Sequence, residues 1–369
     1  MTLLFIIIFT AIINAGQTAY ADDWPMFLKD PQHSSYIDID LAPPLREGWK
    51  FKAGDAFYSS PVVSEGRVFI GNNDGYLYAI EAKTGISLWK FKADGPITST
   101  PAVYGGKVYF GSKYGNIYAV NAADGRLVWK YLINAPVVSS PVVFNGIVYI
   151  GLKNLEFYAL NADSGKMLWV FRSSEYPNYS GIYSSPAIGC NSMVFIAEKN
   201  GTVYALDIQK GSKIWSFRAG SAVYSSPYVN EETIYIGSYD RNLYALDCKK
   251  GSVIWKSTLD EWIYASPVRL KDTIYIGTKG GTLYTLDTAG KVTSSYHVEG
   301  GINSSVSIVR NRYCYVGTDR GYFYAFDLMG KRMTWRYKVN GGIHSSPAII
   351  SNAIFIATTE GILYALVKG

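Results

Sequence analysis

The sequence predicts an all-β fold built from eight copies of one four-stranded antiparallel unit. Composition is the first observation that favours it. Of the 369 residues, 15% are aromatic and only 17% are charged, with 36 glycines and 31 tyrosines. Low charge and high hydrophobicity exclude a disordered chain, and three cysteines are too few for a disulfide scaffold. The excess of strand-forming residues argues against a helical protein.

The second observation is a repeat of about forty residues, marked by three separate residue series. A tyrosine followed by a small and an apolar residue recurs at steps of 40, 40, 46, 40, 40, 40 and 40, at Tyr78, Tyr118, Tyr158, Tyr204, Tyr244, Tyr284, Tyr324 and Tyr364. A Ser/Thr-Pro element recurs at Pro61, Pro101, Pro141, Pro186, Pro227, Pro267 and Pro347, with Val306 in the seventh place. A tryptophan recurs at Trp49, Trp89, Trp129, Trp169, Trp215, Trp255 and Trp335, with Ser294 in one place. Each series therefore counts eight units.

The first complete unit shows what is repeated. Its apolar runs predict strands over residues 56–63, 67–71, 76–81 and 86–92, separated by short turns that contain glycine. The runs are almost continuously apolar, as expected for a sheet that is covered on both faces. Four short antiparallel strands repeated at this period are typical of a propeller blade. We therefore expect an eight-bladed β-propeller.

The two ends of the chain predict how the ring closes. The eighth unit stops at Tyr364-Ala365-Leu366 without a fourth strand, whereas Trp49 precedes the first complete blade. A strand over residues 49–52 would complete blade eight and leave no open sheet edge. We expect a propeller over residues 46–369, with an N-terminal segment over 22–45 packed on it. Deleting residues 46–53 should cost far more stability than its length suggests.

The recurring tryptophans have a structural interpretation. We expect Trp49, Trp89, Trp129, Trp169, Trp215, Trp255 and Trp335 to dock between blades, each worth at least about 2 kcal/mol of apolar burial. Blade six departs from the pattern with Thr285 and Ser294, and blade seven lacks its proline at Val306. We interpret this as a locally degenerate interface; the alternative is a functional site.

The N-terminus predicts export. An apolar run from Leu3 to Ile13 precedes the small-residue site Ala19-Tyr20-Ala21, which predicts a signal peptide over residues 1–21. The alternative is an uncleaved membrane anchor, although the run is shorter than the ~20 residues that a spanning helix needs. No cysteine lies near the cleavage site, so we expect no lipid anchor. The mature protein would be periplasmic or extracellular and not an integral membrane protein.

The repeat resembles a known family. The pattern Ala-x-(Asp/Asn/Glu)-x-x-x-Gly-x-x-x-Trp, as in residues 119–129 and 205–215, is similar to the tryptophan-docking repeat of pyrroloquinoline-quinone (PQQ) dehydrogenases. Residues 23–27, with the Asp-Pro-Gln-His of 30–33, resemble the segment that opens many proteins with this repeat. The resemblance covers residues 23–369 and implies the fold more specifically than any activity.

Two branches of this family have different implications. Quinoprotein dehydrogenases are implied to carry long insertions, a vicinal cysteine pair and a calcium-binding Glu/Asn/Asp set beside PQQ. Here Cys190, Cys248 and Cys314 are isolated from one another, and the blades have almost no insertions apart from about five extra residues between Trp169 and Pro186. The compact branch resembles the propeller lipoprotein of the outer-membrane β-barrel assembly machinery. The chain matches that branch in size, without its lipid-modified cysteine.

Motifs for catalysis are missing. The three histidines show no metal-ligand spacing, and the sequence has no Gly-x-Ser-x-Gly motif, P-loop or dinucleotide fingerprint. The Ser-Ser-Pro elements are interpreted as structural. Basic residues are spread over the repeats, at Lys83, Lys113, Lys153, Lys199 and Lys279 among others, and do not favour nucleic-acid binding. We therefore name no catalytic residue and no metal ligand.

The loops that enter the innermost strands supply the candidate ligand site. Aromatic and polar residues expected at the rim of the central channel are Tyr58, Tyr183, Tyr224, Trp262, Tyr264, Asn303 and His344. One interpretation is that they only pack at the rim. The other is an aromatic-rimmed funnel that stacks a planar ligand or grips a peptide.

The functional hypothesis is a monomeric, non-catalytic binding or assembly scaffold in the cell envelope, with a protein or peptide partner and no cofactor. The alternative hypothesis is a quinoprotein, either a PQQ-dependent oxidoreductase or a PQQ carrier with calcium.

Overall fold

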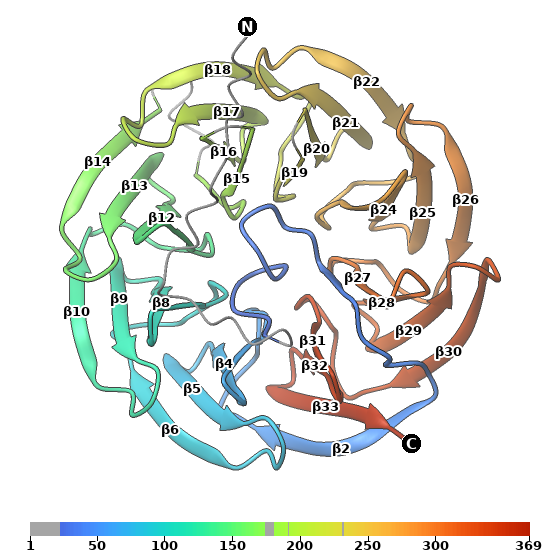
Figure 1. The fold of residues 1–369 in the computed structure, drawn as a ribbon, viewed down its shortest axis with the longest axis horizontal. Coiled ribbons are helices and arrows are strands. Elements are labelled where there is room, and N and C mark those ends of the chain that lie inside the picture. The colour runs from blue at the N-terminus through green and yellow to red at the C-terminus, as the bar shows by residue number, and fades with distance from the viewer. Residues whose placement is uncertain (1–22, 174–180, 191, 231) are drawn as a thin grey trace, which may run out of the picture.

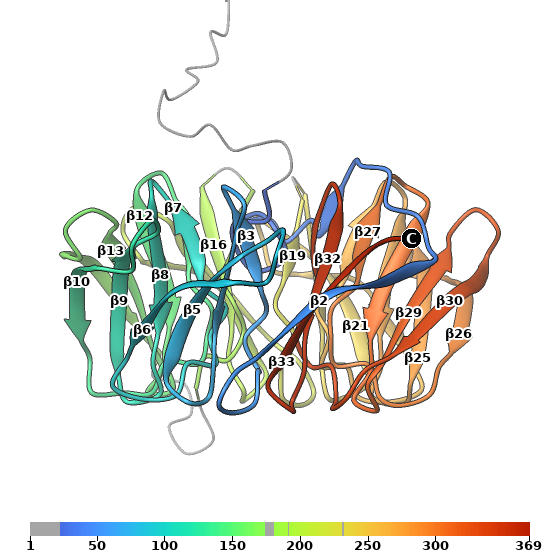
Figure 2. The same cartoon turned by 90° about the horizontal axis from the view of Figure 1, so that it is seen from below.

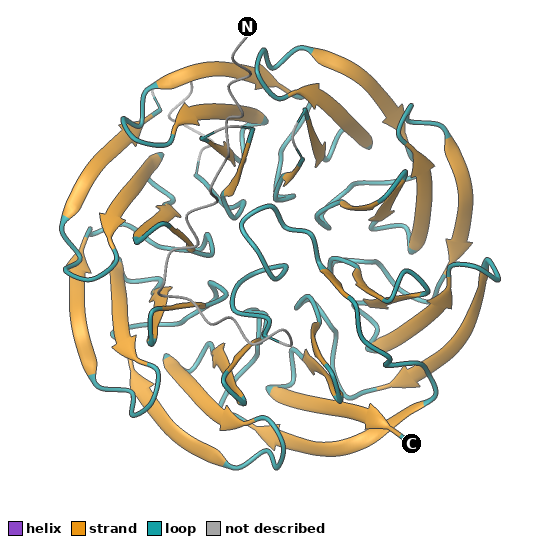
Figure 3. Cartoon of the chain, viewed as in Figure 1, coloured by secondary structure: helices purple, strands orange, loops and turns teal. Residues whose placement is uncertain are grey.

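A computed structural model describes residues 23–173, 181–190, 192–230 and 232–369. Within these residues the chain forms strands and no helix, arranged as eight sheets around a central axis (Figures 1 and 3). Seen from the side, the sheets stand next to one another around the ring (Figure 2). The predicted eight-bladed β-propeller is confirmed. The predicted signal peptide and residues 176–180 of the insertion lie outside the described residues.

Blades one to six are antiparallel sheets of four strands in chain order, the innermost strand first. Blades one and two comprise β3 (Val62–Ser64), β4 (Arg67–Gly71), β5 (Tyr76–Glu81), β6 (Ser87–Lys92), then β7 (Ala102–Tyr104), β8 (Lys107–Gly111), β9 (Asn116–Asn121), β10 (Leu127–Leu132). Blades three and four comprise β11 (Val142–Phe144), β12 (Ile147–Gly151), β13 (Glu156–Asn161), β14 (Met167–Arg172), then β15 (Ala187–Gly189), β16 (Met193–Ala197), β17 (Thr202–Asp207), β18 (Lys213–Arg218). Blades five and six comprise β19 (Tyr228–Val229), β20 (Thr233–Gly237), β21 (Asn242–Asp247), β22 (Val253–Thr258), then β23 (Val268–Leu270), β24 (Thr273–Gly277), β25 (Thr282–Asp287), β26 (Val292–His297).

The last two blades recruit strands from the start of the chain. Blade seven comprises β27 (Ser307–Val309), β28 (Tyr313–Gly317), β29 (Tyr322–Asp327), β30 (Arg332–Lys338) and, parallel to β27, the short β1 (Tyr36–Ile37). Blade eight comprises β31 (Ala348–Ile350), β32 (Ala353–Ala357), β33 (Ile362–Lys368) and, on the outside, β2 (Leu45–Lys52). β2 pairs antiparallel with β33 from Leu45↔Lys368 to Lys52↔Ile362. The predicted closure is therefore confirmed, with a longer strand than residues 49–52.

The innermost strand is shorter than the sequence predicts. β3 begins at Val62 instead of residue 56. Pro61 has no N–H to donate, and the preceding serines use their side chains instead of the backbone ladder. The hydroxyl of Ser59 accepts a hydrogen bond from Gly71 N at 3.2 Å, within the same blade. Side-chain hydrogen bonds thus replace strand pairing next to the axis.

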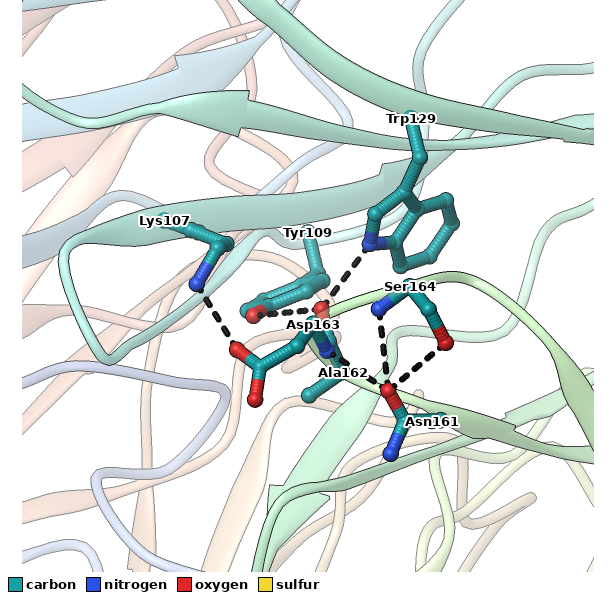
Figure 4. A network of polar contacts seen from close by, with 7 residues as sticks. All are labelled: Lys107, Tyr109, Trp129, Asn161, Ala162, Asp163 and Ser164. Carbon is teal, nitrogen blue, oxygen red and sulfur yellow. Dashed lines mark hydrogen bonds and ion pairs between the residues drawn. The ribbon is translucent and has the colours of Figure 1, made fainter.

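Tryptophan docking joins neighbouring blades. The indole N–H of Trp129, in blade two, donates to the carbonyl of Ala162 in blade three at 2.8 Å (Figure 4). Tyr109 donates its hydroxyl to the same carbonyl at 3.1 Å, and Lys107 pairs with Asp163 at 2.9 Å. The same indole contact to the next blade recurs at Trp49, Trp89, Trp169, Trp215 and Trp255. Trp129 and Trp215 are buried, and the other five recurring rings are partly buried.

A glycine in the following turn receives each docked ring. Gly165 has φ +68°, and a Cβ there would lie 2.7 Å from the ring of Trp129. Gly146 has φ +74° with open space around it. We expect Gly165→Ala to cost about 2 to 3 kcal/mol, and Gly146→Ala about 1 kcal/mol from backbone conformation alone. Urea unfolding of the two variants measures the difference; equal costs would contradict the role of the docking contact.

The N-terminal strand β1 pairs with blade seven, next to the junction of blades six and seven where the repeat is irregular. Thr285 lies opposite Ser294, and its hydroxyl bonds that of Thr293 at 2.8 Å, so hydroxyls occupy the docking position. The carbonyl of Val306 accepts a hydrogen bond from Ser35 at 2.6 Å, just before β27 pairs with β1. The N-terminal segment thus packs at the place where blade seven lacks its proline.

Residues 24–37 form a strap across one end of the channel, where the blue segment crosses the axis in Figure 1. Strap carbonyls accept backbone hydrogen bonds from the innermost strands of blades one, two, four, five and seven, from Val63, Val103, Ile188, Val229 and Ile308, at 2.7 to 3.2 Å. Met26, Leu28 and His33 of the strap are buried. The strap therefore lies across this end and is held by blades on several sides of the ring.

His33 makes the strap sensitive to pH. Its Nδ1 bonds the carbonyl of Pro227 at 2.7 Å, while its Nε2 has no partner within the described part of the chain. Burial lowers the pKa of His33 from 6.5 to about 4. His33 takes up a proton below about pH 6.5 in the unfolded chain, but only below about pH 4 in the folded chain. The free energy of unfolding therefore decreases as the pH is lowered from 6.5 to 4, by about 3 kcal/mol in total.

Urea unfolding at pH 7 and pH 4.5 tests this expectation in the wild type and in His33→Gln. Burial raises the pKa of the neighbouring Asp30, which works in the opposite direction at low pH, so the comparison between the two proteins is the readout. The variant should lose less stability on acidification. Parallel pH profiles would contradict the assignment to His33.

Candidate functional site

The end of the channel opposite the strap forms an open mouth. Strand directions alternate within a blade, so the loops entering the innermost strands and the turns between second and third strands share this end. A cavity of about 110 Å³ lies here on the axis, with Phe27 of the strap in its lining. The cavity is lined by residues of all eight blades. We refer to this cavity and its rim as the mouth.

A ring of hydroxyl groups lines the cavity. Each blade contributes the residue before its proline position: Ser60, Thr100, Ser140, Ser185, Ser226, Ser266, Ser305 and Ser346. The backbone N–H of one ring residue donates to the hydroxyl oxygen of the next, as from Ser60 to Thr100 at 3.0 Å and from Ser346 to Ser60 at 2.9 Å. The same link joins five more pairs. In these seven pairs the residue before the proline position thus joins neighbouring blades, which is a structural role.

Aromatic side chains gather on one side of the mouth, from blades four to six. The ring of Tyr224 lies 5.3 Å from that of Tyr183 and 5.6 Å from that of Tyr264, between ring centres. Tyr239, which the sequence analysis missed, lies 4.9 Å from Tyr224 and stacks on Trp262 at 5.1 Å with an interplanar angle of 12°. These five residues form the aromatic cluster. Trp262 and Tyr264 are 49% and 39% exposed, so the cluster is open to a ligand.

The remaining candidates lie elsewhere around the mouth. Tyr58 is exposed and meets the ring of His344 edge-on at 6.0 Å. Asn303 is buried, and its side-chain oxygen has no partner among the described residues. Trp262 is the one candidate that does not line the cavity itself; it reaches the mouth through Tyr239.

Burial disfavours the charged forms of three groups of the mouth. Burial, followed by the neighbouring Tyr264 and Tyr224, raises the pKa of Tyr239 to about 12. Burial also raises the pKa of Tyr264, and burial followed by the charge of Lys279 lowers the pKa of His344. Tyr239 and Tyr264 therefore keep their O–H groups and can donate hydrogen bonds.

Comparison with known proteins supports the family resemblance. The family model described as outer membrane protein assembly factor BamB matches residues 45–169, 88–191 and 179–368, which overlap to span the propeller. The chain belongs to this family. A sequence comparison with curated proteins finds no match.

Solved structures show the fold of this BamB-type, PQQ-like family. BamB from Moraxella catarrhalis has 17% identity and a TM-score of 0.76, covering 88% of this chain and 100% of that one. A europium-containing methanol dehydrogenase has 12% identity and a TM-score of 0.80, covering 94% and 98%. A quinohemoprotein alcohol dehydrogenase from Comamonas testosteroni has 14% identity and a TM-score of 0.80, covering 94% and 80%. BamB and the two alcohol dehydrogenases represent the two branches named above, and both branches share the fold of this chain.

The donor set implied for a quinoprotein does not match the residues found in this BamB-type chain. Among the described residues no group of three or more His, Cys, Asp or Glu side chains could hold a metal ion. The mouth offers hydroxyls, tyrosines and one histidine instead of a calcium-binding carboxylate set. The same described residues include no helix long and apolar enough to span a membrane.

Two cysteines, treated as isolated in the sequence analysis, form a disulfide. Cys190 follows β15 in blade four, and Cys248 follows β21 in blade five; their Cα atoms are 6.2 Å apart. Both lie at the strap end, away from the mouth. Cys314 is free and buried. Sequence separation hid the pair, because contact between neighbouring blades brings together residues that are 58 positions apart.

Proposed function

We propose that this BamB-type propeller is a non-catalytic binding scaffold of the cell envelope, and that its mouth holds a peptide or protein partner. The aromatic cluster above a hydroxyl-lined cavity carries the proposal. Partly exposed tyrosine and tryptophan rings supply rigid apolar contact area together with hydrogen-bond donors, and such residues are enriched where proteins bind partners. The strap closes the far end, so a ligand enters from one side.

Two features support the envelope location. The first is the predicted signal peptide. The second is the disulfide between Cys190 and Cys248, since disulfides persist in oxidising compartments such as the periplasm and are rare in the cytosol. The family description refers to outer-membrane assembly, which is consistent with an envelope partner.

A peptide-display selection tests the binding role. Peptides enriched on the wild-type protein should bind Tyr224→Ala/Tyr264→Ala at least tenfold more weakly, because two rings of the cluster are removed. The matched control is Tyr104→Ala/Tyr313→Ala, which removes two partly buried tyrosines at the strap end of the blades. Equal affinity for wild type and mouth variant would contradict the proposal.

The quinoprotein alternative rests on the same aromatic cluster, which offers ring faces to a planar ligand. Purified protein is mixed with PQQ and calcium, passed through gel filtration, and tested for dye-linked alcohol or sugar oxidation. Under our proposal no quinone absorbance follows the protein. Retained PQQ with turnover would overturn the scaffold role.

A further inference from the structure

Lysines occupy equivalent positions around the mouth. In every blade the residue two places after the second strand donates its backbone N–H to the carbonyl of the loop entering the innermost strand, at 2.9 to 3.1 Å. These residues are Asn73, Lys113, Lys153, Lys199, Tyr239, Lys279, Asp319 and Thr359. Three of the lysines sit in the consecutive blades two, three and four. Basic residues that look scattered in the sequence therefore form a collar on one side of the mouth.

The three consecutive collar lysines are not ion-paired in the described part of the chain. Lys113, Lys153 and Lys199 are partly buried, and no ion pair joins any of them to an acid within the described part of the chain. Lys153 lies over the ring of Tyr183, 5.1 Å from its centre, which connects the collar to the aromatic cluster.

Acidic groups at the same end already accept hydrogen bonds from the protein. Asp94 accepts from Ser112 at 2.5 Å, and Asp260 accepts from Thr282 at 2.6 Å. Asp319, at the collar position of blade seven, accepts from Gly301 N at 2.8 Å. Hydrogen bonds keep these carboxylates charged, so Asp94 offsets part of the positive charge of blade two. The lysines of blades two to four form no ion pair among the described residues, and they lie away from blade seven, where an acid takes the collar position.

The cavity inside the collar can complete an anion site. Each ring hydroxyl linked above accepts a backbone N–H, and its own O–H remains available to donate to a ligand in the cavity. The cavity of about 110 Å³ is well below the ~300 Å³ at which small-molecule pockets begin, so it fits one side chain better than a multi-ring ligand. A carboxylate entering here would meet hydroxyl donors and tyrosine O–H groups, with ammonium groups at the rim.

We propose that the mouth binds an acidic peptide segment of a partner protein, which lies over blades two to four and inserts one carboxylate side chain into the hydroxyl ring. This inference rests on the proposed binding role and adds the chemistry of the partner. Charge complementarity between the collar and an acidic segment sets its position, and the tyrosines contact the peptide beside the inserted side chain. The formal net charge of +6 favours the encounter with such a segment.

Fluorescence anisotropy with a labelled octaglutamate peptide tests the inference on the full mature chain. The wild type should bind the peptide, with an affinity that falls as salt rises. Lys113→Gln/Lys153→Gln/Lys199→Gln should bind at least tenfold more weakly. The matched control is Lys83→Gln/Lys166→Gln/Lys249→Gln, which removes the same charge from exposed turns at the strap end and should change affinity less than twofold. Thermal unfolding checks that both variants fold.

The outcomes separate this inference from the proposed function. Equal losses in both triple variants would mean that net charge alone attracts the peptide, and would overturn the site. An absence of octaglutamate binding, with display-selected peptides still sensitive to Tyr224→Ala/Tyr264→Ala, would overturn the acidic partner and leave the mouth as a binding site. Insensitivity to both the lysine and the tyrosine changes would overturn both proposals.

Discussion

Replacing residues 46–52 with a Gly-Ser segment of equal length is expected to destabilise the propeller by more than about 5 kcal/mol, enough to abolish a single cooperative unfolding transition in a protein of ordinary stability. The replacement removes Trp49, whose ring packs against Gly85 and whose indole N–H donates to Ala82 in blade one at 3.0 Å. It also removes Phe51, 5.2 Å from Tyr78 in the same blade. Losing one fully buried aromatic ring costs about 3 to 5 kcal/mol, and here two partly buried rings and the strand pairing are lost together.

The size of this effect comes from topology. β2 joins the start of the chain to β33 at its end, so its loss opens the ring and exposes the edge of blade eight. The control changes only outward-facing residues of the same strand, as Arg46→Ser/Lys50→Ser/Lys52→Ser, and should cost less than about 1 kcal/mol. Calorimetry measures both proteins. Similar transition temperatures would show that the ring does not depend on this closure.

Removing the disulfide is expected to cost about 4 kcal/mol. Cys190 and Cys248 close a loop across blades four and five with a sequence separation of 58, and a loop of that length gives this figure in the chain-entropy model. Cys190→Ala/Cys248→Ala should unfold at lower urea than the oxidised wild type, with no further change on adding reductant. The reduced wild type should fall to nearly the same stability. A wild type that is indifferent to reductant would contradict a structural disulfide.

The sequence predicted the parts of the fold that repetition makes visible. Eight units, closure through Trp49 and the docking tryptophans all follow from a period of about forty residues, because each blade must bury the same faces against its neighbours. The early start of the innermost strand at residue 56 was wrong, because the hydroxyl of Ser59 accepts from Gly71 N and the N–H of Ser60 donates to the hydroxyl of Thr100 where strand pairing was expected. The strand propensity of these residues does not reveal that side-chain hydrogen bonds replace backbone pairing here.

The candidate site was predicted in outline. Tyr183, Tyr224 and Tyr264 share one position of the repeat, so the register alone placed them at the rim together. Tyr239 was missed because it belongs to a different turn, where lysine is the usual residue, and only the folded ring brings it to Tyr224. Aligning the turn positions across blades would have revealed both this tyrosine and the lysine collar.

Hydrogen exchange in the presence of a saturating display-selected peptide tests most directly where this propeller binds. Occupation of the mouth predicts slower exchange in the segments around residues 112–114, 152–154, 182–184 and 222–224, with no change in the strap or the outer strands. Protection confined to the outer strands or to residues 24–37 would contradict the mouth as the binding site.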